Sequence, residues 1–188
     1  MSERTRRTNN PEGVRRHVLS AAADLVQEQG IAPLTLDAVA RRAGVSKGGL
    51  LHHFPAKAAL VESLLEDLLD RLDTAIDAAM ADDAEPQGRY SRAYLSAIAM
   101  LDADGSDCAS GWSSVCAALV AEPALRSRWQ AWVEGRKAAH AETDGSPDCA
   151  LVRLAADGLW LADVSGSPQF RPEERRVLME RLQDLTRT

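Results

Sequence analysis

Residues 35–57 read TLDAVARRAGVSKGGLLHHFPAK, and this stretch decides the fold. Thr35 is placed to cap a first short helix, because its hydroxyl oxygen can accept a free amide proton of the opening turn. Gly44 stands where a helix ends in a left-handed residue, a conformation that glycine adopts without steric strain. Ser46 is placed to cap a second short helix that holds Leu50 and Phe54 on its buried side. Two short helices joined by a glycine turn predict a helix-turn-helix, whose second helix can enter the major groove of DNA.

The segment VSKGGLLHHFPAKAAL, residues 45–60, resembles the recognition-helix signature of TetR-family transcriptional regulators, whose usual form is close to V-S-x-G-T-L-Y-x-H-F-x-x-K-x-x-L. TLDAVARRAGVS resembles the helix before it, and the likeness covers about residues 10–65. Gly49 replaces a common Thr or Ser, and Leu51 and His52 stand where the family commonly has aromatic residues that touch the DNA backbone. The matching positions are Val45, Ser46, Gly48, Leu50, His53, Phe54, Lys57 and Leu60.

The resemblance implies an all-α protein of about nine helices, with a three-helix DNA-binding domain followed by a helical domain for ligand binding and dimerisation. We expect a disordered basic arm at residues 1–9, the DNA-binding domain at 10–56 and the second domain at 57–188. Apolar spacing and breaks predict helices at about 11–29, 56–80, 89–101, 108–120 and 148–162, and others that start at Pro123 and Pro172. Residues 81–88 are expected to form a linker without a periodic pattern.

The charge is divided unevenly along the 188 residues, whose net charge is −6. Residues 1–60 hold nine Lys or Arg against five Asp or Glu, whereas the remainder holds thirteen against twenty-three. A basic first part can meet DNA phosphates, and the acidic remainder cannot. The first part is therefore expected to bind double-stranded DNA.

The three cysteines lack metal-ligand spacing and are interpreted as free thiols of a reducing compartment. No apolar run approaches the length of a membrane span and no signal peptide is evident, so we expect a cytoplasmic protein. No Ser-His-Asp arrangement, phosphate loop or metal motif is present. The sequence therefore predicts neither an enzyme nor a bound cofactor or metal.

DNA contact is assigned to residues of the helix-turn-helix and of the next helix. Lys47 suits a phosphate or a guanine edge, and the glycine pair leaves room for the backbone to approach the groove closely. Lys57, at the first turn of the following helix, is expected to face solvent and a DNA phosphate. The candidates are Thr35, Lys47, Gly48, Gly49, Leu51, His52 and Lys57.

The resemblance further implies a cavity in the second domain for a small-molecule effector. A tryptophan at helical spacing more often belongs to the core, but all four tryptophans lie in this half of the chain. Between Tyr94 and Val133 the only Lys or Arg residues are Arg126 and Arg128, so we expect few charges in the wall and an effector that is largely apolar, neutral or cationic. The candidate lining residues are Tyr94, Met100, Trp112, Cys116, Trp129, Trp132 and Trp160.

The last two long helices are expected to form a homodimer interface, as the resemblance implies. The helix at 148–162 is apolar around more of its circumference than one buried face requires. The candidates are Leu151, Leu154, Ala155, Leu159, Val177, Leu178 and Leu182. We therefore expect a ligand-responsive regulator, most simply a repressor that a small molecule releases from a palindromic operator. The alternative is a DNA-binding structural or co-regulatory protein whose second domain serves dimerisation only and binds no ligand.

Overall fold

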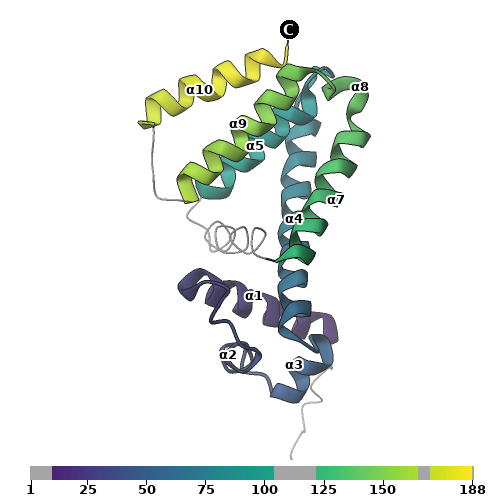
Figure 1. Ribbon diagram of the computed structural model, residues 1–188, viewed down its shortest axis with the longest axis vertical. Coiled ribbons are helices and arrows are strands. Elements are labelled where there is room, and N and C mark those ends of the chain that lie inside the picture. The colour runs from purple at the N-terminus through teal and green to yellow at the C-terminus, as the bar shows by residue number, and fades with distance from the viewer. Residues whose placement is uncertain (1–9, 104–121, 165–169, 188) are drawn as a thin grey trace, which may run out of the picture. The chain divides into compact units, whose positions relative to one another are not determined.

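The computed structural model describes residues 10–103, 122–164 and 170–187. In these residues the chain forms helices and no strand, which confirms the all-α fold (Figure 1). The chain divides into two compact units, Met1–Leu64 and Leu65–Thr188. The helices are α1 (Pro11–Gln29), α2 (Leu36–Arg42), α3 (Lys47–His53), α4 (Lys57–Asp82), α5 (Arg89–Ala103), α7 (Pro123–Ala139), α8 (Ala141–Asp144), α9 (Pro147–Val164) and α10 (Pro172–Leu185).

The first helix begins and ends where its sequence signals stand. The Asn10 side chain accepts a hydrogen bond from the Gly13 amide at 3.0 Å, and Pro11 occupies the first turn, where a missing N–H is harmless. Gly30 ends the helix with φ +78°. Its buried face contributes much of the core of the first unit: Val18, Leu19, Ala21, Ala22, Leu25 and Val26.

The helix-turn-helix is built as its sequence predicts. The hydroxyl oxygen of Thr35 accepts from the Ala38 amide at 3.2 Å, and that of Ser46 accepts from the Gly49 amide at 3.1 Å. Gly44 has φ +61°, which turns the chain between the two helices. On the inner side of α3, Leu50 and Phe54 are at most 1% exposed. Because α3 has only seven residues, this burial rather than helix propensity holds it in place.

The core of the second unit forms between helices that are distant in sequence. Helix α5 packs along α9, and α10 packs on both. The residues of α4 from Leu65 onward contribute an apolar stripe, and α7 contributes Leu125. The main buried side chains are Leu65, Leu68, Leu69, Leu72, Ile76, Leu95, Ile98, Leu125, Val152, Leu159 and Leu182.

Two parts of the helix assignment differ from the sequence prediction. The four-residue helix α8 was not expected, because it lies at the edge of a Gly/Ser/Pro break and is too short to show a period. The helix predicted at about 108–120 lies outside the described residues, as does the arm at 1–9. The remaining long helices agree within a few residues of their expected ends.

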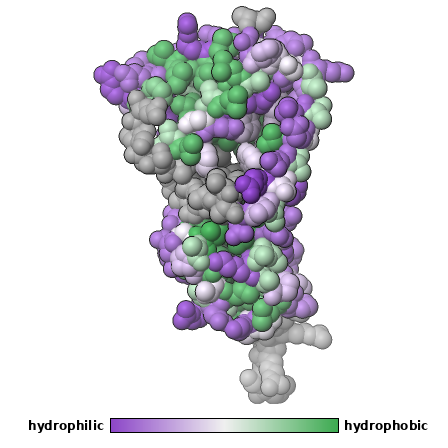
Figure 2. Space-filling view, in the orientation of Figure 1, coloured by the Kyte–Doolittle hydropathy of each residue, from purple (hydrophilic) through white to green (hydrophobic). Residues whose placement is uncertain are grey.

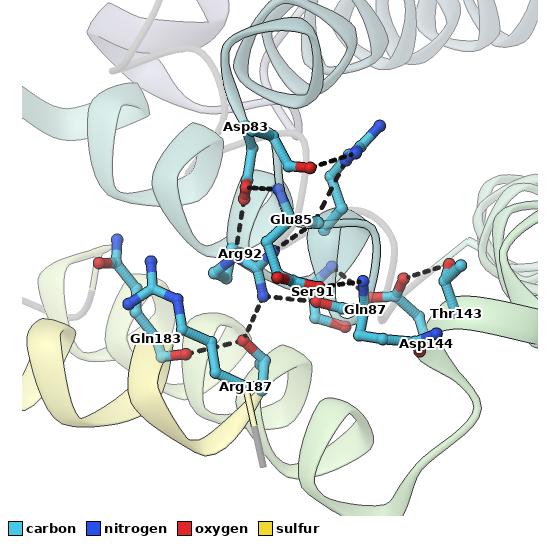
Figure 3. Close-up of polar contacts among 12 residues, drawn as sticks. Asp83, Glu85, Gln87, Ser91, Arg92, Thr143, Asp144, Gln183 and Arg187 are labelled. Atoms are coloured by element: carbon cyan, nitrogen blue, oxygen red, sulfur yellow. Dashed lines mark hydrogen bonds and ion pairs between the residues drawn. The ribbon is translucent and has the colours of Figure 1, made fainter.

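A buried arginine fixes the connection between α4 and α5, which the sequence showed only as a linker (Figure 3). Arg92 is 4% exposed. Its guanidinium donates to the Asp83 carboxylate at 2.7 Å and to the main-chain oxygens of Glu85 and Gln87. It also donates to the Thr186 hydroxyl at 2.8 Å, which ties this connection to the end of α10. Hydrogen bonding to Arg92 lowers the pKa of the Asp83 carboxyl.

The carboxylate of Asp144, at the end of α8, caps the N-terminal turn of α5. Its Oδ1 accepts from the Ser91 amide at 2.7 Å, and its Oδ2 accepts from the Thr143 hydroxyl at 2.8 Å (Figure 3). Asp144 is 3% exposed, so these hydrogen bonds replace those that water would have made. The short helix α8 therefore positions the start of α5.

Candidate DNA-binding surface and ligand pocket

The outer side of α3 combines a cation with a patch free of side chains. We call Lys47, Gly48, Gly49, Leu51 and His52 the recognition face, because all five are exposed. A Cβ added at Gly48 would meet no atom within 4 Å, and one added at Gly49 would lie 3.2 Å from the Ser46 Oγ. The helix therefore offers bare backbone, flanked by Lys47, to whatever approaches it.

The amine of Lys47 is engaged but available. Its Nζ lies 2.9 Å from the Asp37 carboxylate, and both side chains are more than 60% exposed. A surface pair of this kind contributes about 0–1 kcal/mol, so a phosphate can compete for the amine. Thr35 is also exposed, and its oxygen is used in the cap of α2.

The expectation that Lys57 faces solvent is wrong. Its Nζ donates to the main-chain oxygens of Ile31 at 2.8 Å and Ala32 at 2.9 Å, and the residue is half-buried. The amine therefore holds the link between α1 and α2 against the start of α4. The sequence could not show this, because two carbonyl oxygens some 25 positions away leave no side-chain signal.

Further supports of the first unit also escaped the sequence. The His17 ring nitrogen Nε2 lies 3.1 Å from the carbonyl oxygen of Ala43. The Arg15 guanidinium lies 5.5 Å from the centroid of the Phe54 ring and donates to the Ser63 hydroxyl. These contacts hold α1 against the residues that surround the recognition face.

The second unit contains a pocket of about 250 Å³ between α5, α7 and α9. One side of it is aromatic, and the rings continue beyond the pocket itself. Trp132 lies 5.2 Å from the ring of Trp129 and 6.4 Å from that of Tyr94, and Tyr90 lies 6.1 Å from Tyr94. We call this the α5–α7–α9 pocket; it is lined by Tyr90, Tyr94, Trp132, Val133, Lys137, Ala150, Arg153, Leu154 and Asp157.

Two hydrogen bonds fix the aromatic wall of this pocket. The Tyr94 hydroxyl donates to the Asp157 carboxylate at 2.5 Å. Burial raises the pKa of the Asp157 carboxyl, while the bond from Tyr94 and the charge of Arg153 act in the opposite direction. The Trp132 indole donates to the Asp73 carboxylate of α4 at 2.9 Å, and Asp73 is also paired with Arg136.

The expected effector residues fall into three groups. Tyr94 and Trp132 line the pocket, and Trp129 stacks on Trp132. Trp160 is not among the lining residues, and its indole nitrogen is buried without a partner in the described part of the chain. The Met100 side chain lies outside the described residues, together with Trp112 and Cys116. Binding by any of these side chains stays a prediction.

The expectation of a wall with few charges is wrong for this pocket. Lys137, Arg153 and Asp157 all line it. The sequence argument counted cations only between Tyr94 and Val133, whereas the folded chain brings in side chains from the end of α7 and from α9. The pocket also contains Tyr90, which precedes that window.

The expected dimer residues divide by exposure. Leu151, Leu154 and Val177 are 51%, 69% and 46% exposed, and Ala155 and Leu178 are half-buried. Leu159 and Leu182 are instead buried in the core of the chain itself, at 7% and 6% exposed. This corrects their placement on a free face, because Leu159 of α9 and Leu182 of α10 belong to the inner core of the second unit.

The exposed apolar residues extend beyond those expected. Figure 2 shows hydrophobic residues gathered over the region of α9 and α10. Leu161 and Leu185, which were not expected, are also exposed, at 59% and 37%. We call Leu151, Leu154, Leu161, Val177 and Leu185 the apolar face. Exposed apolar side chains on two helices that pack together are typical of a protein contact.

The described residues contain neither a metal-binding cluster nor a membrane-spanning helix. No group of three or more His, Cys, Asp or Glu is arranged to hold a metal ion in the described ranges. Among the helices of those same ranges, none has the length and apolar character required to span a bilayer.

An exposed recognition helix in a helix-turn-helix, joined by α4 to a helical unit with a pocket, defines a DNA-binding transcriptional regulator. Residues 18–64 match the family described as bacterial regulatory proteins, tetR family, and residues 88–187 match the tetracyclin repressor-like C-terminal domain. The chain belongs to the TetR family of transcriptional regulators.

Several known proteins are similar over most of the chain. The HTH-type transcriptional regulator BetI of Escherichia coli is 30% identical over 177 residues, which cover 84% of this chain and 86% of BetI. The structure of a transcriptional regulator from Streptomyces coelicolor has a TM-score of 0.74 at 20% identity and covers 93% of this chain and 99% of its own. The multidrug binding protein EbrR, complexed with malachite green, has a TM-score of 0.71 at 24% identity and covers 92% and 97%. The two structural likenesses show the fold.

Proposed function

We propose that this regulator is a repressor that binds a pseudo-palindromic operator as a homodimer and leaves it when a small molecule occupies the α5–α7–α9 pocket. One hydrogen bond between α7 and α4 is the main support for the proposed response to a ligand. The indole N–H of Trp132, in the pocket wall, donates a hydrogen bond to the Asp73 carboxylate of α4 at 2.9 Å. A ligand that moves this ring therefore acts directly on α4.

The same carboxylate is shared with a second residue of α7. Arg136 pairs with Asp73 and lies 3.5 Å from the Asp77 carboxylate, so α7 is joined to two positions of α4. Helix α4 is continuous from Lys57 to Asp82, and it begins four residues after α3 ends. A displacement along α4 thus reaches residues next to the recognition helix. The ligand shifts this equilibrium only to the extent that it binds one state better than the other.

DNA binding is assigned to the recognition face together with Thr35. Lys47 exchanges Asp37 for a phosphate or a guanine edge, His52 reaches a phosphate, and Leu51 makes an apolar contact such as one with a thymine methyl. Gly48 and Gly49 let the backbone of α3 approach the bases closely. Lys57 acts mainly by holding the link between α1 and α2. We propose that its amine also contacts a DNA phosphate.

Dimerisation is assigned to the apolar face of α9 and α10. Two recognition helices related by a two-fold axis require two half-sites at a fixed separation, which is why a palindromic operator accompanies a dimer. The complex of EbrR with malachite green shows a small molecule bound by a protein of this fold, and this supports a ligand role for the present pocket.

The experiment begins with selection of operator fragments from random DNA by the purified protein, followed by footprinting. We expect two protected half-sites related by a two-fold axis. A chemically diverse library is then screened for compounds that raise the thermal midpoint and dissociate the selected DNA. If the DNA is bound but no library compound raises the midpoint or releases it, the ligand response is wrong, and a second unit that only dimerises is the better description.

A further inference from the structure

Arg153 of α9 lines the α5–α7–α9 pocket, and hydrogen bonds from one nitrogen of its guanidinium hold the side chain in place. Its Nη1 donates to the Ser91 hydroxyl at 2.6 Å and to the Asp144 carbonyl oxygen at 3.2 Å. Ser91 and Asp144 are themselves joined at the capped start of α5 (Figure 3). The guanidinium carbon also lies 5.9 Å from the centroid of the Tyr90 ring. The orientation of this side chain is therefore set before any ligand arrives.

The remaining donors of Arg153 lie on one edge of the guanidinium. Both described hydrogen bonds leave from Nη1, and neither Nε nor Nη2 has an acceptor among the described residues. In those residues the one fully buried side-chain nitrogen or oxygen without a partner belongs to Trp160, so neither Nε nor Nη2 of Arg153 is fully buried. A planar pair of parallel N–H groups matches the two oxygens of a carboxylate.

The other charges of the pocket favour an anion. Lys137 adds a second cation, and the only partner described for its amine is the exposed Glu134 at 3.3 Å. The opposing charge is Asp157, one oxygen of which already accepts from Tyr94. Burial raises the pKa of the Asp157 carboxyl, which favours its neutral form, whereas an arginine stays charged. A cationic ligand would face two cations in the wall, and an anionic ligand would face one such carboxyl.

We propose that the effector is an apolar carboxylate, whose two oxygens accept from Nε and Nη2 of Arg153 while its hydrocarbon body packs on Trp132, Tyr94 and Val133. This inference rests on the proposed ligand response and replaces the sequence-based expectation of a neutral or cationic effector. The pocket volume of about 250 Å³ admits a small aryl or alkyl acid.

The test uses the full chain and compares its affinity for ligands that have nearly the same shape but different charge. Phenylacetate and naphthylacetate are compared with their amides, which have nearly the same size and no charge, and with phenethylamine as a cation. Binding is followed by titration calorimetry. We expect each acid to bind at least about tenfold more tightly than its amide, because a bidentate charged pair is stronger than a neutral hydrogen bond. Phenethylamine should bind more weakly than either.

Substitutions assign the preference to a residue. Arg153→Gln should reduce the preference for acid over amide to less than about threefold, and Arg153→Lys, which keeps the charge but loses the fork, should give an intermediate value. Arg128→Gln is the control, because Arg128 is 53% exposed on α7 and lies outside the pocket wall. Circular dichroism checks the fold of each variant. If Arg153→Gln does not fold, Arg153→Lys and the preference of the unaltered protein decide.

Each outcome has a definite meaning. Amides or the amine that bind as tightly as the acids, or a panel in which no acid binds, overturn the carboxylate assignment. An acid preference that survives both Arg153 substitutions overturns the role of Arg153. The proposed function fails separately: acids then bind with the expected preference, but neither they nor any other compound changes operator affinity.

Discussion

The recognition face and the α5–α7–α9 pocket are built over very different distances in the chain. All five residues of the recognition face belong to the seven-residue helix α3, and its caps lie within the helix-turn-helix itself. The pocket instead joins residues from Tyr90 to Asp157 on three helices, and the partners of those residues lie on α4 and α8 as well. A local surface can keep its form while side chains change, whereas the pocket depends on every helix that supplies a wall.

The largest expected effect tests how far the recognition face depends on the buried side chains beneath α3. Phe54→Ala should destabilise the first unit by about 3–5 kcal/mol, because Phe54 is 1% exposed and its removal leaves a cavity under α3. Operator binding should be lost in parallel. Urea unfolding followed by circular dichroism, with fluorescence anisotropy on labelled operator, measures both. Normal operator affinity in this variant would show that α3 is held by other contacts.

This difference in distance also explains what could be predicted from the sequence. Thr35, Gly44 and Ser46 act on neighbours three or four positions away, so residue type and spacing were sufficient. Lys57 bonds to main-chain oxygens about 25 positions away, and Arg153 enters the pocket from another helix, so neither role was visible. Leu159 was placed on the dimer face because periodicity shows that a residue is apolar and not which neighbour covers it.

The next largest effect concerns Arg92, the buried arginine that joins the α4–α5 connection to the end of α10. Arg92→Ala should cost roughly 3 kcal/mol, because it leaves Asp83 and several carbonyl oxygens without their donor. Arg187→Ala, which removes an exposed side chain of the same region, should be nearly neutral. Urea unfolding compares the two. An equal loss in both variants would mean that burial of Arg92 adds nothing.

The pair of Arg92 and Asp83 also gives a dependence on pH. The pKa of Asp83 is lowered in the folded chain, so the unfolded chain takes up the proton first as the pH falls. The stabilisation is therefore complete above the usual aspartate pKa of about 3.9 and is lost as the pH falls below it. Asp83→Asn should flatten this part of the stability profile, whereas a profile unchanged by that substitution would exclude Asp83 as its source.

A third substitution separates the outer apolar face from the inner core of α9. Leu161→Arg should weaken dimerisation by about 2 kcal/mol or more, roughly thirtyfold, because a charge would enter a desolvated contact. Leu161 is 59% exposed, so the fold of each chain should survive. Leu159→Arg, at a residue 7% exposed, should instead unfold the chain. Sedimentation and thermal unfolding distinguish these results, and an unaltered dimer in Leu161→Arg would contradict the proposed interface.

A smaller effect tests whether the pocket communicates with α4 through Asp73. Asp73→Ala removes the acceptor of Trp132 and the partner of Arg136 and should reduce the coupling between ligand and operator by about 0.5–2 kcal/mol. Ligand affinity should change less than this coupling. The measurement is operator affinity with and without a saturating compound found in the screen. Asp70→Asn is the control, because Asp70 is exposed on the same helix and its carboxylate has no described pairing with α7. Full coupling in Asp73→Ala would mean that another contact carries the signal.

The smallest expected effect returns to the recognition face and has opposite signs for folding and for binding. Gly48 has no positive φ, and a Cβ there would meet no atom within 4 Å, so alanine fits the free protein. Gly48→Ala should stabilise α3 by about 0.5 kcal/mol, because alanine loses less backbone entropy than glycine in a helix. If the backbone of α3 approaches the bases closely, the added methyl group must at the same time weaken operator binding.

Gly135→Ala on α7 is the matched control. A Cβ there also meets no atom within 4 Å, so this substitution should give a similar gain in stability without a change in operator affinity. Thermal unfolding and fluorescence anisotropy measure the two signs. Operator affinity unchanged in both variants would show that Gly48 does not face the groove, and the recognition face would then have to contact DNA through its other residues, Lys47, Gly49, Leu51 and His52.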